Sequence, residues 1–202
     1  MDLMELFTKG GAVMYLLLLT SVAVTAIGIE RLVFYHYADN DSEKFLETLQ
    51  AQIRIKDKNK IAELCHAEKN LAGKVAFAGV LAAIQNENVG VALDMAYSEA
   101  AMKLRARLNH LSMIVTLSPL LGLLGTISGM IDAFNIFNLQ SGQPLAITGG
   151  IGEALTATAT GLCVAIFALI VHTYFAQRLD EMLAKLEKAA SIVLGTFGGK
   201  VN

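Results

Sequence analysis

The sequence predicts an all-α membrane protein with three transmembrane helices and long helical extensions into the cytoplasm. Three observations lead to this prediction. The chain of 202 residues is 54% hydrophobic and only 17% charged, whereas soluble domains are about a quarter charged. Three long apolar runs are separated by polar segments, and lysine and arginine concentrate in two of those segments. Those two segments also repeat apolar residues at helical spacing.

The first apolar run, residues 11–29, contains 19 uncharged residues. As a helix it would be about 28 Å long, close to the ~30 Å hydrocarbon core of a bilayer. Residues 1–10 hold two acids and one lysine, unlike the basic start of a secretory signal peptide, and no convincing cleavage site follows the run. We therefore expect a retained span, preceded by a short amphipathic segment on the outer side.

The second and third apolar runs, 111–137 and 147–175, are each long enough for one crossing. A polar turn lies between them, and Gly142 and Pro144 are helix breakers within it. Residues 138–146 are therefore expected to form a short outer loop.

The two remaining segments, 30–110 and 176–202, are expected to be helical and cytoplasmic. Of the 16 lysines and arginines, 11 lie in 30–110 and 4 after residue 175, whereas the outer segments hold only Lys9. Positive charge stays on the cytoplasmic side, so the N-terminus is predicted outside and the C-terminus inside. No proline interrupts 90–117 or 145–194, so the second and third spans should continue as long helices into the cytoplasm.

Glu153 is the one charged residue between 147 and 171 and the main candidate for function. A mid-bilayer acid costs about 2.5–3.5 kcal/mol on insertion scales and usually faces a protein interior or a water-filled cavity. No lysine or arginine occurs between 108 and 177, so the spans offer no basic partner. Such a carboxyl group suits proton uptake and release. The competing interpretation places Glu153 among the outer headgroups.

Three threonines follow Glu153 at informative spacings. Thr160 lies nearly below it on the same helix face and Thr156 about 60° away, so a polar stripe descends from the carboxylate like the wall of a pore. Thr158 lies about 140° away and should face a different neighbour. On the second span, the simpler interpretation of Thr126 is a hydroxyl bonded to a carbonyl of its own helix.

One face of the second span carries small residues at steps of four, three and four: Ser118, Gly122, Gly125 and Gly129. Such a face lets a neighbouring helix backbone approach closely, and alone it indicates packing and nothing more. Pro119 is expected to kink or loosen the helix beside it.

Other polar residues have a structural interpretation that we prefer. Asp132, His110 and His172 are expected to be interfacial, and the alternative for them is proton entry or exit. Cys65 and His66 lack a second ligand pair at zinc-like spacing, so no metal is expected. No nucleophile–base set, phosphate loop or nucleotide fingerprint occurs, and the net charge is −2. Neither an enzyme nor a nucleic-acid-binding protein is therefore expected.

Three arginines lie near the predicted cytoplasmic face of the membrane: Arg105, Arg107 and Arg178. Side chains of this type anchor helix ends and attract anionic headgroups. We expect them to hold the helices at the interface or to bind phospholipid.

Three blocks of the sequence form a recognisable set: FTKGGAVMYLLLLTSVAVTAIGIERL at 7–32, LSPLLGLLGTISGMIDAF at 117–134 and GGIGEALTATATGLCVAI at 149–166. They resemble the ExbB/TolQ/MotA family of inner-membrane motor proteins, most closely its ExbB branch. The last two blocks together are highly specific, and the first is weak alone. Two features depart from the family: Phe167 stands where a proline is common, and the outer N-terminal segment lacks the long extension of some ExbB proteins.

The resemblance implies a five-subunit ring of this chain in the bacterial inner membrane. The ring encloses the transmembrane helices of a small ExbD-like partner, whose single span brings an aspartate. Ring and partner conduct protons down their gradient and move a TonB-like protein that reaches the outer membrane. No cofactor is implied beyond the translocated proton.

Carried over by motif position, the pore glutamate of the family falls on Glu153 and its two polar pore threonines on Thr126 and Thr158. The resemblance thus ranks Thr158 above Thr160, against the helix geometry. Two alternatives stay open. One is a TolQ-like motor of the Tol-Pal envelope system, and the other is a non-conducting membrane scaffold, which needs the small-residue face but not Glu153.

Overall fold

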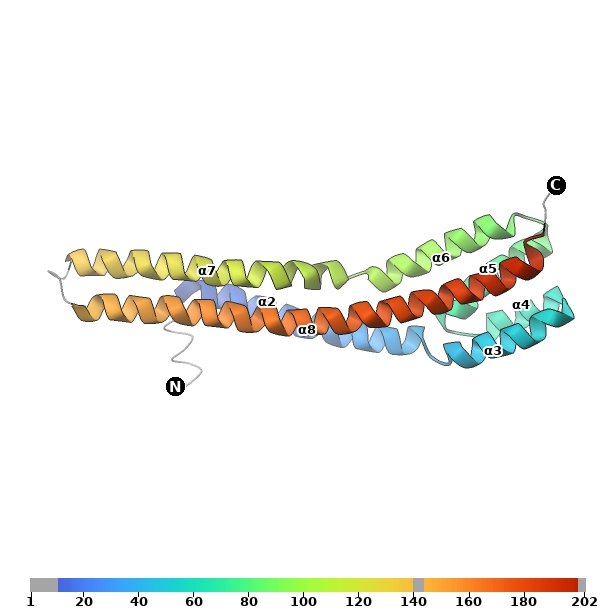
Figure 1. Ribbon diagram of the computed structural model, residues 1–202, viewed down its shortest axis with the longest axis horizontal. Coiled ribbons are helices and arrows are strands. Elements are labelled where there is room, and N and C mark those ends of the chain that lie inside the picture. Colours follow the sequence, from blue (N-terminus) through green and yellow to red (C-terminus); the bar gives the residue numbers. More distant parts are fainter. Residues whose placement is uncertain (1–10, 140–143, 200–202) are drawn as a thin grey trace. The chain divides into compact units, whose positions relative to one another are not determined.

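The computed structural model describes the backbone of residues 11–139 and 144–199. Side chains are described for residues 11–135 and 148–199. Its elements are α2 (Gly11–Ala38), α3 (Ser42–Gln52), the 3-10 turn η1 (Ile53–Ile55), α4 (Lys58–Ala67), α5 (Leu71–Gln85), α6 (Val89–Arg105), α7 (Leu108–Leu139) and α8 (Pro144–Phe197) (Figure 1). Every regular element in these ranges is helical, which confirms the all-α prediction. The amphipathic segment expected at 1–10 lies outside the described residues.

The chain divides into two compact units. One, here called the transmembrane unit, comprises Met1–Ile29 and Arg107–Tyr174; the other, the peripheral unit, comprises Glu30–Ala106 and Phe175–Asn202. Three helical stretches are long and apolar enough to cross a membrane, which agrees with the three predicted spans. Helix ends are not membrane boundaries, however, so the predicted limits of the spans and of the 138–146 loop remain predictions.

The transmembrane unit buries one side of each helix and leaves large apolar side chains on the other. At the start of α2, Val13, Met14 and Leu17 form a buried cluster against Leu121 of α7. In contrast, Leu19 of α2 is 68% exposed within the single chain. Exposed surface of this kind suits lipid tails or other membrane helices.

The third span continues as predicted, but the second does not. Helix α8 runs unbroken for 54 residues. The helix expected over 90–117 is instead divided into α6 and α7, and Arg107 between them has a left-handed φ of 71°. No proline or glycine lies at this break, so the sequence contains no local signal for it. Helix α7 itself continues through Pro119.

The peripheral unit begins its short helices with side-chain caps. Asp57 accepts backbone N–H bonds at the start of α4, Asn70 does so for α5 and Asn88 for α6. Asn70 is 1% exposed and also donates its amide to the backbone oxygen of Asn40, 3.1 Å away. These caps fix where each helix begins, because the first four N–H groups of a helix have no partner within it.

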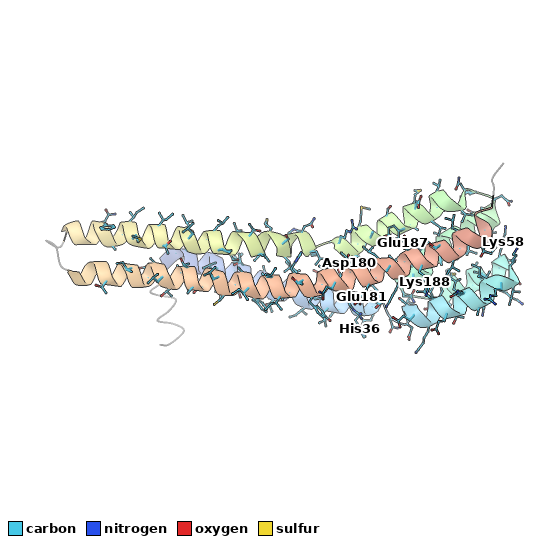
Figure 2. The ribbon with its side chains drawn as sticks, in the orientation of Figure 1. His36, Lys58, Asp180, Glu181, Glu187 and Lys188 are labelled. Carbon is cyan, nitrogen blue, oxygen red and sulfur yellow. The ribbon has the colours of Figure 1, made fainter. Side chains whose placement is uncertain are left out.

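Helix α5 is the centre of the peripheral unit. It packs against α4 and α6, and a Cβ placed on Gly79 would lie 2.5 Å from a methyl group of Leu93 and 2.9 Å from one of Val193. The last part of α8, which carries Val193, therefore closes over α5 and α6. The charged side chains Asp180, Glu181, Glu187 and Lys188 are labelled on α8 in Figure 2.

An ion-pair cluster joins the end of α2 to α8 inside this unit. The ammonium of Lys185 lies 2.9 Å from both carboxylate oxygens of Asp39. Arg178 lies 3.5 Å from the same carboxylate and 2.7 Å from Glu181. The Asp39 side chain is only 10% exposed, so this pair is less screened by water than surface pairs are.

Candidate functional site

Glu153 lies on α8 in the transmembrane unit and is half-buried within the single chain. Its neighbour Ala154 is 2% exposed and packs against Gly129 of α7, where a Cβ would lie 3.2 Å from the Ala154 Cβ. The carboxylate thus sits beside the α7–α8 contact. No ion pair to Glu153 occurs among the described residues of this unit.

The first residue of α2 also lies against this carboxylate. A Cβ placed on Gly11 would be 2.6 Å from Oε1 of Glu153. Gly11 marks the start of the predicted first span, so Glu153 is level with the first turn of α2. Helices α7 and α8 continue past that level (Figure 1). Glu153 therefore lies at one end of the three-helix part of the unit, and beyond it α8 continues beside α7 (Figure 1).

The hydroxyls of the four candidate threonines bond in two ways. Thr126, Thr156 and Thr160 donate to carbonyls of their own helices, at 2.6, 2.8 and 2.9 Å respectively. Thr158 instead donates across the interface to the carbonyl of Gly122 on α7, at 3.0 Å. Thr158 thus faces a different neighbour from Glu153, in line with the 140° offset between them. The donors of all four are occupied in the single chain.

The small residues of α7 lie directly against α8. A Cβ on Gly122 would be 3.1 Å from the Cα of Thr158, and one on Gly125 would be 2.5 Å from the Cβ of Ala157. From the other side, a Cβ on Gly161 would lie 2.7 Å from the carbonyl oxygen of Ser118. Backbones meet here without intervening side chains, which is the close approach that small residues allow in membranes.

Ser118 is fully buried at this contact, and its Oγ has no hydrogen-bond partner among the described residues. It stands next to Pro119, which has no N–H to donate to the carbonyl one turn earlier in α7. A polar region therefore lies between α7 and α8, one turn along α7 from the Thr158–Gly122 bond.

Two residues of α2 that are not among the predicted site residues stabilise the end of α6. Arg31 is 5% exposed and donates from Nη1 to the carbonyl of Lys103, at 3.1 Å. The hydroxyl of Tyr35 donates to the carbonyl of Leu104, at 2.9 Å. The last carbonyls of a helix lack partners within it and carry partial negative charge. These two side chains thus satisfy them where α6 stops.

The other candidates are distributed over both units. Asp132, His110, Arg105 and Arg107 are exposed, and His172 is half-buried. Arg178, as described above, pairs with carboxylates of this chain. The interfacial and lipid-binding roles of these residues remain predictions.

Cys65 lies in the packed interior of the peripheral unit, whereas His66 is exposed. Cys65 is 1% exposed, and the His66 ring packs edge-on against Phe77 with centroids 5.3 Å apart. Burial, with a further contribution from the Glu68 carboxylate, raises the pKa of the Cys65 thiol to about 12. Packing thus accounts for both side chains.

Several known proteins are similar to this chain in sequence. The biopolymer transport protein ExbB-like 1 of Synechocystis sp. is 35% identical over 176 residues, which cover 84% of this chain and 68% of that protein. TolQ of the Tol-Pal system of Pseudomonas aeruginosa is 35% identical over 100 residues, which cover 49% of this chain and 43% of TolQ. The biopolymer transport protein ExbB of Salmonella typhimurium is 37% identical over 86 residues, which cover 42% of this chain and 35% of ExbB.

The match to a family extends over most of the functional region. Residues 67–188 match the MotA/TolQ/ExbB proton channel family. This stretch includes α7, Glu153 and the whole α7–α8 contact. The chain therefore belongs to the MotA/TolQ/ExbB proton channel family.

Proposed function

We propose that this chain is the channel-forming subunit of a proton-driven motor of the ExbB–ExbD type in the bacterial inner membrane. In this role, copies of the chain, five on the family pattern, surround a one-span partner with a membrane aspartate. Proton flow through the assembly energises TonB-dependent transport across the outer membrane. Glu153 takes up and releases the protons, and Thr126 and Thr158 line their path.

The observation that carries this proposal is the setting of Glu153. Its carboxylate lies beside two tightly packed helices, in a stretch of the chain with no lysine or arginine from 108 to 177. An acid in such a place binds and releases protons instead of forming a permanent ion pair. A scaffold would not need it.

The ExbB-type role is preferred over a TolQ-type role because of the resemblance of the motifs and because the Synechocystis relative that covers 84% of this chain is named ExbB-like. The matches to Salmonella ExbB and to Pseudomonas TolQ cover 42% and 49% of this chain and do not separate the two roles. The growth tests described below separate them.

The test measures proton flux into liposomes that contain the full chain and an ExbD-type one-span protein. Glu153→Gln should abolish gradient-driven flux, because the amide keeps the shape of the side chain but does not bind a proton. Asp132→Asn is the matched control, since it neutralises the exposed acid of α7. It should keep flux near the wild-type level.

Assembly of each complex is measured in the same preparations by native mass spectrometry, which also counts the subunits. Equal flux from wild type and Glu153→Gln, with both assembled, would contradict the channel role and favour a scaffold. Loss of flux in Asp132→Asn alone would move the proton path to α7. Two growth tests then separate the roles. Loss of growth on iron carriers that need TonB would indicate an ExbB-type role, and loss of tolerance of detergents would indicate a TolQ-type role.

A further inference from the structure

Gly11 occupies an unusual place at the start of α2. Its φ is +65°, a left-handed conformation that favours glycine, and it is the first residue of the helix. The space that a side chain would fill is taken by Oε1 of Glu153, 2.6 Å from the ideal Cβ position. The carboxylate oxygen is therefore no more than about 4 Å from the Gly11 Cα.

The start of α2 is chemically suited to this neighbour. The first four N–H groups of a helix have no partners within the helix, and the helix dipole places partial positive charge there. No basic side chain of the spans is available for Glu153. Among the described residues, the backbone at the start of α2 is a positive group that lies next to the carboxylate.

The first turn of α2 is also held firmly in the unit. Val13 is 8% exposed and Met14 is 3% exposed, and both belong to the buried cluster with Leu17. The Val13 side chain lies 3.6 Å from the position of a Cβ on Gly125 of α7. Gly11 is thus two residues from an anchored contact, and a side chain added at Gly11 would displace the carboxylate instead of the helix.

We propose that Gly11 is a positioning residue for Glu153. Its bare backbone leaves the space for the carboxylate, and the amide end of α2 stabilises the ionised form during proton transfer. This inference rests on the proposed role of Glu153 as the proton carrier.

The test compares Gly11→Ala with Gly152→Ala in the full chain assembled with its one-span partner. Gly152 is the matched control because it directly precedes Glu153 and no described atom lies within 4 Å of its Cβ position. Two quantities are measured: proton flux per assembled complex, and the rate at which a hydrophobic carbodiimide labels Glu153, read by mass spectrometry. Carbodiimides react with the protonated carboxyl group.

Gly11→Ala should lower flux about tenfold or more, because small displacements of reacting groups have effects of this size. It should also label Glu153 about two- to fivefold faster, since the helix end no longer favours the anion. Gly152→Ala should match wild type in both. Wild-type flux and labelling in Gly11→Ala would overturn the proposal.

Gly11→Asn separates collision from backbone strain, because asparagine tolerates positive φ but still adds a Cβ. The proposal expects it to behave like Gly11→Ala, and recovery of wild-type behaviour would assign the effect to strain. Should these variants fail to assemble, Glu153→Asp withdraws the carboxylate by one methylene without altering α2. It should lower flux about tenfold, and undiminished flux would overturn the proposal.

The labelling rate keeps this inference separate from the proposed function. If Glu153→Gln conducts like wild type, the proton-carrier role fails. The carbodiimide rate still reports whether Gly11 controls the carboxyl group.

Discussion

At the residue scale, the Cys65 thiol has an environment with a measurable chemical consequence. Burial between α4 and α5, together with the Glu68 carboxylate, raises its pKa from 9.0 to about 12. The reactive thiolate is therefore nearly absent from the folded protein at pH 8. Maleimide should modify Cys65 only after denaturation, as followed by mass spectrometry of the peptide that carries it, because the other cysteine, Cys163, is exposed in the single chain. Rapid modification of Cys65 in the folded protein would contradict the burial of this side chain.

The same raised pKa gives a stability effect of known sign. The unfolded thiol loses its proton near pH 9, whereas the folded thiol keeps it up to about pH 12. Its contribution to stability is fully present below pH 9 and is lost as the pH rises between these values. Cys65→Ala should lack this part of the alkaline destabilisation in thermal unfolding scans.

Around Glu153, the sequence predicted the direction of Thr158, which bonds to α7, but not the residues that lie against the carboxylate. The acid is conspicuous in an uncharged run, and helix geometry placed Thr158 away from it. The contact with Gly11 could not be predicted, because it depends on where α2 begins relative to α8. In the sequence, nothing distinguishes Gly11 from its neighbour Gly10.

At the element scale, the α7–α8 contact depends on the absence of side chains. A Cβ on Gly161 would lie 2.7 Å from the Ser118 carbonyl oxygen and 3.0 Å from the Gly122 Cα, which are backbone atoms that cannot rotate away. Gly161→Ala should therefore destabilise the protein by about 1–3 kcal/mol through overpacking. Thermal unfolding in detergent measures this.

Gly149→Ala is the control for that substitution, because no described atom lies within 4 Å of its Cβ position. It should leave the unfolding midpoint nearly unchanged, or raise it slightly through helix propensity. Equal midpoints for the two variants would show that the helices separate readily at Gly161.

The end of α6 gives a second prediction at this scale. Tyr35→Phe removes the hydroxyl that bonds to the Leu104 carbonyl and keeps the ring, which packs edge-on against Phe175 with centroids 5.5 Å apart. The substitution should lower the free energy of unfolding by about 0.5–1.5 kcal/mol and speed amide hydrogen exchange in the last turn of α6. Tyr37→Phe is the control, since Tyr37 is 72% exposed. Similar exchange in both variants would contradict the cap.

The α6–α7 break differs from α2 and α8 in having no local signal in the sequence. The apolar runs, the absence of prolines and the charge pattern were sufficient for α2 and α8. The break at Arg107 has no such signal, because Arg31 and Tyr35 satisfy the α6 carbonyls from more than sixty residues away in the chain. Contacts between distant residues of this kind leave no periodicity to detect.

At the scale of the whole molecule, the predicted orientation follows from charge alone. Of the 16 lysines and arginines, 15 lie in 30–110 or after residue 175, and such segments remain in the cytoplasm. A green fluorescent protein fused after Asn202 should fluoresce, whereas alkaline phosphatase at the same site should be inactive. Active phosphatase there would reverse the assignment.

Within the peripheral unit, the unbroken course of α8 fixes the spacing between Lys185, which bonds to Asp39 at the end of α2, and Val193, which lies beside Gly79 of α5. Each residue of the helix advances by about 1.5 Å and turns by about 100°. One residue inserted between these two positions would turn one of them about 100° away from its partner. Lineages that carry this helix can therefore change its length between the two contacts only in near-whole turns.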